Sequence, residues 1–139
     1  MTDQHAPATL RRLGDSNLTV AFPDEDVRGR PVLDRDGEEV GTVSDLIVDD
    51  RVTRVRFLEV ASGGVLGIGE TKVLIPVDVI ARITDDAVRI DDTREHVGGL
   101  PRYDPTLAGR PYWEDLYGYY GYGPYWAPGY VYPPYPRLL

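Results

Sequence analysis

The chain has 139 residues, room for one small domain with extensions, and carries a formal net charge of −8. That charge argues against a nucleic-acid partner, because phosphate neutralisation needs clustered lysine and arginine. The lack of cysteine excludes disulfides and thiolate metal ligands. There is no apolar run of about 18 residues to span a membrane and no secretory h-region in residues 1–12. We therefore expect a cytoplasmic protein without a transmembrane segment.

In chain order, residues 1–23 are polar and irregular, and we expect a flexible N-terminal arm there. From residue 24 to residue 100, short apolar runs alternate with turn signals at close spacing, which is typical of an all-β domain. About six short strands in so few residues favour a small closed β-barrel over a sandwich. The first hairpin is predicted at Asp34-Arg35-Asp36-Gly37, because glycine supplies the positive φ of the turn.

In the middle of the domain, the alternation of apolar and polar residues is interrupted once, and a proline is placed to end a strand. Val55 and Phe57 alternate with arginines, but Leu58 falls on the opposite face, so we expect a β-bulge in this strand. Pro76 is predicted to end the strand that begins at Lys72. A last hairpin is expected over residues 79–90.

Two short helices are predicted beyond the strands. Thr93 to Val97 is expected to form one helical turn, ended by Gly98-Gly99. Pro111 is suited to the first position of a second helix, because its missing N–H is not needed there.

None of the polar motifs predicts an enzyme. The glycine-rich loop at residues 63–72 has Glu70 where a phosphate-binding loop would need lysine. Asp34–Glu38 has too few oxygen positions for a calcium loop, so a hairpin turn explains it better. His5 and His96 have no second histidine or cysteine at ligand spacing. We therefore expect no catalytic residue, no metal and no cofactor.

Several motifs in a fixed order extend from Asp26 to Ile90. They are Val27-Arg28-Gly29-Arg30-Pro31-Val32, the run from Gly37 to Asp49, Val55-Arg56-Phe57-Leu58, the loop from Gly63 to Gly69, and Leu74-Ile75-Pro76-Val77. This set resembles the PRC-barrel family, which includes the cytoplasmic domain of the photosynthetic reaction-centre H subunit and the C-terminal domain of the ribosome maturation factor RimM.

The resemblance implies a small β-barrel that acts as a docking or assembly module. The chain departs from both of those members, because it lacks the transmembrane helix of the H subunit and the N-terminal RNA-processing domain of the maturation factor. It looks most like the stand-alone bacterial members of the family. A docking role on a foreign complex, either a reaction-centre-like membrane complex or the ribosome, is the alternative that the resemblance leaves open.

The C-terminal tail, residues 101–139, differs in composition from the barrel. Eleven of the fourteen aromatic residues lie between Tyr112 and Leu139, together with several prolines. So much aromatic surface would favour aggregation if it stayed in water. Three outcomes stay open: the tail folds against its own barrel or a sister chain, it folds only on a partner, or it stays disordered.

We expect the tail to be a contact element, because Tyr and Trp are the residues most enriched in interface hot spots. Every copy carries the same tail, so a homo-oligomer is the simplest assembly. The predicted function is a non-catalytic protein-interaction or assembly module that self-associates through barrel and tail. The predicted interaction residues are Trp113, Leu116, Tyr117, Tyr120, Tyr125, Trp126, Tyr130 and Tyr132.

Overall fold

A computed structural model of the chain describes residues 10–15, 20, 23–49, 54–63, 71–100, 102–103, 110–120 and 129–135; for residues 15, 23 and 110–113 it describes the backbone alone. The strands are β1 (Leu10–Arg12), β2 (Pro31–Leu33), β3 (Glu39–Asp49), β4 (Arg54–Ser62), β5 (Thr71–Pro76), β6 (Ile80–Ile83) and β7 (Val88–Ile90). The α-helices are α1 (Arg94–Gly98) and α2 (Arg110–Tyr120), and short 3-10 helices are η2 (Leu13–Asp15), η3 (Pro23–Glu25) and η4 (Val77–Val79).

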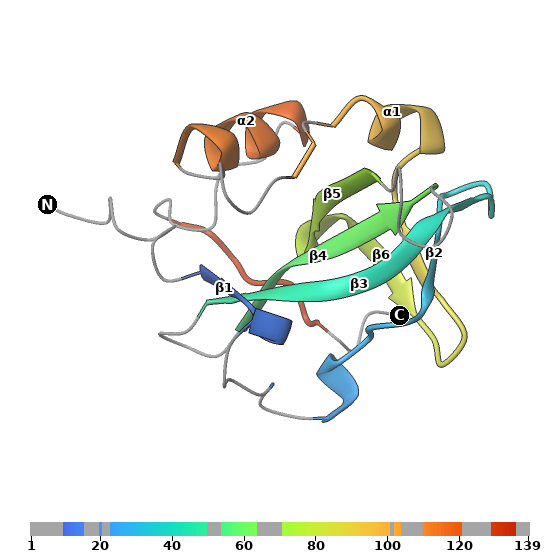
Figure 1. Cartoon of the computed structure of the whole chain (residues 1–139), viewed down its shortest axis with the longest axis horizontal. Coiled ribbons are helices and arrows are strands. Elements are labelled where there is room, and N and C mark those ends of the chain that lie inside the picture. Colours follow the sequence, from blue (N-terminus) through green and yellow to red (C-terminus); the bar gives the residue numbers. More distant parts are fainter. Residues whose placement is uncertain are drawn as a thin grey trace, which may run out of the picture.

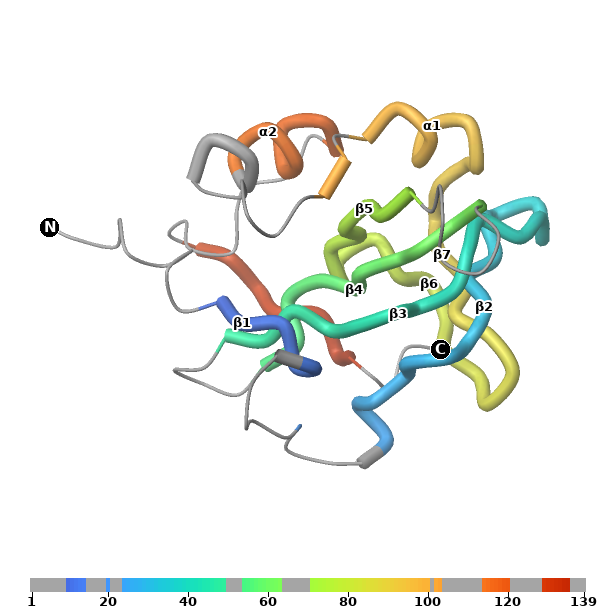
Figure 2. Tube along the Cα trace, viewed as in Figure 1, coloured from blue at the N-terminus to red at the C-terminus, as the bar shows by residue number. Residues whose placement is uncertain are grey.

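The strands form one sheet in the order β5-β4-β3-β2-β7-β6. Figure 1 labels β2 to β6, and Figure 2 adds the label of β7. The long strand β3 is its centre, since β4 pairs along one edge while β2 and β1 share the other. The neighbours β2 and β7 run parallel, with Val32 opposite Val88, whereas the other described pairs are antiparallel. The prediction of an all-β fold is confirmed, with seven described strands instead of about six.

The expected closure of the barrel is wrong, because the sheet does not close. The hydrogen-bonded order ends at β5 and β6, and η4 connects these two strands in the chain. Pro76, the last residue of β5, has no backbone N–H for continued pairing. Val77 and Val79 of η4 are buried and fill the barrel interior at this corner.

Part of the expected flexible arm belongs to the sheet. Leu10 to Arg12 pairs with the second half of β3, and Leu13 is buried in the core. The strand is short and polar, so its sequence gives little strand signal. Its attachment depends on Arg12, whose partners lie far away along the chain.

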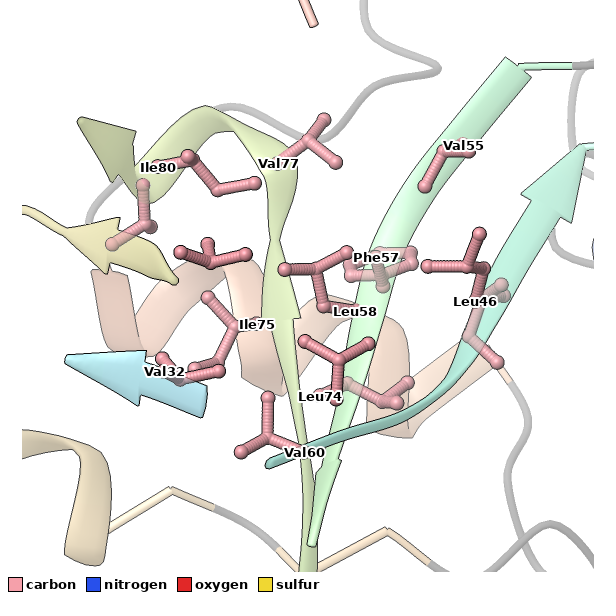
Figure 3. Close-up of a cluster of buried hydrophobic side chains, with 14 of the residues drawn as sticks. Val32, Leu46, Val55, Phe57, Leu58, Val60, Leu74, Ile75, Val77 and Ile80 are labelled. Carbon is pink, nitrogen blue, oxygen red and sulfur yellow. The ribbon is translucent and has the colours of Figure 1, made fainter. Parts of the chain in front are cut away.

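The core is built mainly from aliphatic side chains, together with Phe57, that converge from β2, β3, β4, β5, η4 and β6 (Figure 3). The predicted bulge in β4 is confirmed at Arg56: Phe57 pairs with Ile47 and Val55 with Val48, so Arg56 is the extra residue. A second register shift in β3 leaves Ser44 without an opposite residue in β4.

The two α-helices lie on one side of the sheet, near β4 and β5 (Figure 1). The N-cap of α1 is Thr93, whose side chain accepts a hydrogen bond from the His96 N–H, and its C-cap is Gly99. α2 brings Tyr117 into the core, where its ring centroid lies 5.6 Å from that of Phe57. Both helices therefore form close to where the sequence predicts them.

Candidate interaction surfaces

The described part of the tail packs on the barrel of its own chain. Leu116, Tyr117 and Tyr135 are buried members of the barrel core, while Tyr120, Tyr130 and Tyr132 are partly buried against it. Of the other predicted interaction residues, Trp113 lies in α2 without a described side chain, and Tyr125 and Trp126 lie outside the described residues. The tail therefore enlarges a core that a domain of this size would otherwise leave small.

Helix α2 is held to α1 through an aromatic contact. The Tyr119 ring stacks on His96 at 4.3 Å between centroids, and its hydroxyl donates to the His96 carbonyl at 2.6 Å. His96 Nδ1 in turn lies 2.8 Å from an oxygen of Asp92. A β-carbon at position 99 would meet the Tyr119 hydroxyl, so a larger residue than Gly99 would displace this tyrosine. These bonds fix both helices as one layer.

A second tail segment, Gly129–Tyr135, is named here the C-terminal strap. In Figure 2 it is the red tube that passes close to the start of β4. Tyr130 donates to Asp78 Oδ2 at 2.8 Å, Tyr132 to the Val55 carbonyl at 2.9 Å and Tyr135 to the Glu25 carbonyl at 2.5 Å. Three hydroxyls thus attach the strap to three different elements of the barrel.

Two arginines of β4 also contact the strap. The guanidinium carbon of Arg54 lies 4.7 Å from the centre of the Tyr132 ring, and that of Arg56 lies 5.4 Å from it. Arg56 also pairs with the buried Asp49 at 3.4 Å between Nη2 and Oδ2. Cations over aromatic faces contribute about 0.5–1 kcal/mol each at exposed sites and more when desolvated.

Burial keeps the strap hydroxyls protonated. Desolvation raises the pKa of Tyr132 to about 12, and it raises the pKa of Tyr130 and Tyr135 as well. Desolvation also raises the pKa of Asp78, against the opposing effect of the hydrogen bond from Tyr130. The phenols therefore act as hydrogen-bond donors throughout the neutral range.

The outward side of the strap is apolar. Val131 lies between two anchored tyrosines and is 81% exposed, the one large apolar side chain so exposed among the residues that the structure describes. The alternation of inward Tyr130, outward Val131 and inward Tyr132 is that of a β-strand. Within the described ranges, the backbone groups of these three residues make no hydrogen bond. The strap therefore resembles an unpaired edge strand.

A groove at the other end of β4, named here the β4–α1 groove, is the second candidate surface. It consists of two adjoining hollows of about 320 and 430 Å³ that share Val40, Ser62, Gly63 and Arg94. Val60, Val97 and Leu100 form a buried apolar floor in the first hollow. Gly41 lines the second hollow, and a side chain there would collide with the backbone of Ala61.

The buried carboxylates are engaged in the fold. Glu59 receives two hydrogen bonds from Arg12, at 2.9 and 3.2 Å, and one from Ser44 at 2.6 Å. Desolvation raises the pKa of Glu59, but the bonds from Arg12 and Ser44 prevail, and the net shift is downward. Lys72 Nζ lies 3.7 Å away. This arrangement holds β1 on the sheet and keeps the carboxylate charged.

Asp34 has a similar structural role in the first hairpin. Its carboxylate accepts the backbone N–H groups of Asp36, Glu38 and Arg94 at 2.9–3.0 Å. These bonds outweigh desolvation and lower the pKa of Asp34.

Among the described residues, no group of three or more His, Asp or Glu side chains is placed to hold a metal ion.

The sequence did not indicate Asp78, Val131 or the arginines of the groove as site residues. The alternation Tyr130-Val131-Tyr132 was a usable signal for the strap. Arg94 and Arg102 gave no such signal, because the fold alone brings them to the same groove.

In the part of the chain that is described, no helix combines the length and apolar character needed to cross a membrane.

The fold and its surfaces define a small β-barrel domain completed by an aromatic tail. A family model described as PRC-barrel domain matches residues 20–97, more than half of the chain. The chain belongs to the PRC-barrel family, as its motifs indicated. Domains of this family are generally non-catalytic and mediate protein interactions. A search of curated proteins found no match to this chain.

Proposed function

We propose that this protein is a non-catalytic assembly module that self-associates, with the C-terminal strap as the central contact. The observation that supports this is the open edge of the strap: Val131 faces outward and the backbone from Tyr130 to Tyr132 has no partner among the described residues. Such an edge accepts another extended chain through main-chain hydrogen bonds. A second copy supplies an identical edge.

The local sequence favours a closed pair over an open-ended array. Gly129, with φ of +81°, precedes the strap, and Pro133-Pro134 follows its open part. Prolines cannot donate to a ladder, so pairing is limited to a few residues. Around a two-fold axis, Val131 of one copy would lie opposite Val131 of the other.

The burial of the other predicted interaction residues indicates which role each has in the proposed contact. Leu116 and Tyr117 are engaged in their own core and support the contact indirectly, while Tyr130 and Tyr132 hold the strap in position. A stable interface buries about 1,200–2,000 Å² in total, more than one short strand provides. The proposal therefore extends the contact to Trp113, Tyr120, Tyr125, Trp126 and the neighbouring barrel surface.

Light scattering of the full-length chain over a range of concentrations tests the proposal. The wild type is expected to form a dimer or larger assembly, and Val131→Lys is expected to weaken it by placing like charges across the axis. Thr42→Lys is the matched control, because Thr42 is exposed on β3 and lies six positions before Val48, which pairs with the strap contact Val55. A monomeric wild type, or a Val131→Lys variant that associates as well as Thr42→Lys, would show the proposal to be wrong.

Point substitutions are preferable to removal of the tail. Leu116, Tyr117 and Tyr135 are part of the barrel core, so a truncated chain would lose stability together with any contact surface. Circular dichroism of each variant separates these effects, since Val131 and Thr42 are exposed and their replacement leaves the core intact.

A further inference from the structure

The β4–α1 groove differs from the strap in place and in chemistry. The strap contacts Val55 near the start of β4, whereas the groove includes Ser62 at its end. Seven residue steps along a strand separate these positions by about 23 Å. A partner in the groove would therefore leave the strap accessible, and the inference goes beyond self-association.

The floor of the first hollow suits an apolar side chain. Val60, Val97 and Leu100 are each less than 5% exposed, and Val40 and Val73 are partly buried beside them. These five residues come from β3, β4, β5, α1 and the residue after α1's C-cap, so the barrel and α1 hold them in fixed positions. A volume of about 320 Å³ is at the lower end of ligand pockets, large enough for one leucine or valine side chain.

The rim of the same hollow is basic, on a chain of net charge −8. Arg94 and Arg102 line it together with the hydroxyl residues Ser62 and Thr71, and no Asp or Glu is among its described lining residues. Arg102 is exposed and makes no ion pair with another described residue. Arg94 approaches Glu38 only to 3.8 Å, with both side chains more than half exposed, so that pair is weak.

We propose that the β4–α1 groove binds an extended acidic segment of a partner protein. One apolar side chain of that segment enters the first hollow, and carboxylates on either side of it meet Arg94 and Arg102. The elongated shape supports a peptide, because the second hollow continues past Gly41 and Thr42 along β3. The exposed Glu39 also lines this second hollow, so the carboxylates of the segment are placed over the first hollow, whose described lining has no acidic residue. A nucleic acid fits less well, because it carries no aliphatic side chain for the apolar floor and needs more clustered cations than the two arginines of this rim.

The proposal can be tested by titrating the full-length chain with short capped peptides and following the backbone amide NMR signals of Val40, Ser62 and Gly98. The probe is an acetylated, amidated Glu-Glu-Leu-Glu-Glu peptide. Two matched peptides replace its glutamates by glutamine or its leucine by serine. The acidic leucine peptide is expected to bind most tightly and to bind more weakly as salt is added.

Matched protein variants locate the binding. Changing both Arg94→Gln and Arg102→Gln is expected to weaken binding roughly threefold to tenfold, the range for exposed ion pairs. Changing both Arg82→Gln and Arg89→Gln, on strands β6 and β7, removes the same charge elsewhere and is expected to leave binding unchanged. Equal binding of the glutamine or the serine peptide would contradict the proposal, as would equal weakening by the two double variants or no shift of the groove signals with any peptide.

Discussion

In the barrel, β3 and β4 satisfy their backbone groups by pairing with each other. The side chains that they add to the hydrophobic core can therefore be aliphatic, with Phe57 as the exception. The C-terminal strap lies on the same barrel without any backbone ladder to it among the described residues. Its tyrosines supply both parts of the attachment, with rings packed against the barrel and hydroxyls donating to Asp78, Val55 and Glu25. A segment that does not pair with the barrel through its backbone needs side chains that are apolar and polar together, which explains the tyrosines of the strap.

The largest effect is expected at Leu116, which lies in the tail but is fully buried in the barrel core. Leu116→Ala is expected to lower the free energy of unfolding by about 2–5 kcal/mol, because it leaves a cavity. Leu74→Ala, at an equally buried site in β5, is expected to cost a similar amount. Urea unfolding measures both, with Val131→Ala as an exposed control expected within about 0.5 kcal/mol of wild type. A negligible cost for Leu116→Ala alone would mean that the tail is a detachable appendage.

Strand β1 is attached in a third way. It is too short for a long backbone ladder and has no aromatic residue, so the charged hydrogen bonds of Arg12 help to hold it. Arg12→Ala is expected to cost about 1–3 kcal/mol, because buried Glu59 loses two hydrogen bonds from a cation. The pKa of Glu59 is lowered in the folded state, so its contribution is present above the ordinary value of 4.5 and is lost as pH falls through the folded value. Urea unfolding as a function of pH should show less acid sensitivity in the variant. Unchanged stability with unchanged acid sensitivity would mean that β1 is held by its backbone pairing alone.

The smallest expected effect comes from a single strap hydroxyl. Tyr132→Phe removes the hydrogen bond to the Val55 carbonyl and is expected to cost about 0.5–1.5 kcal/mol at neutral pH. The pKa of Tyr132 rises from its ordinary 10.0 to about 12, so its contribution is complete below pH 10 and is lost as pH rises toward 12. Unfolding followed by phenolate absorbance should therefore show a weaker loss of stability across this window in the variant. If the free energy of unfolding fell with rising pH in the same way in both proteins, the Tyr132 hydroxyl would not contribute to the attachment of the strap.

Much of the fold could be predicted from local sequence signals, because at turns, strand ends and helix ends a single residue determines the backbone geometry. Gly37 has the positive φ of +87° that the Asp-Gly hairpin needs, Pro76 ends β5, and Thr93 caps α1. The bulge at Arg56 follows from a change of phase within one strand. Each of these features depends on neighbours in the sequence.

What the sequence did not predict depends on contacts between distant residues. β1 is only three residues long, and its chief side-chain partner, Glu59, lies 47 positions beyond Arg12. The open edge between β5 and β6 depends on how η4 turns the chain in space. The predicted interaction residues were chosen by residue type, which does not separate a buried Tyr117 from an exposed Val131. The groove was missed for the same reason, since neither Arg94 nor Arg102 is unusual in isolation.

The bond from Tyr135 to Glu25 joins residues 110 positions apart, and this separation has a consequence for biosynthesis. In a chain made from its N-terminus, the described strands emerge before the strap, which begins 39 residues after the end of β7. Until then the end of the barrel around Glu25 and Val55 lacks the aromatic residues that cover it. Contacts of such long sequence separation slow folding and prolong the exposure of apolar surface. The newly made protein is therefore most prone to aggregation in the interval between the emergence of β7 and the docking of its last tyrosine.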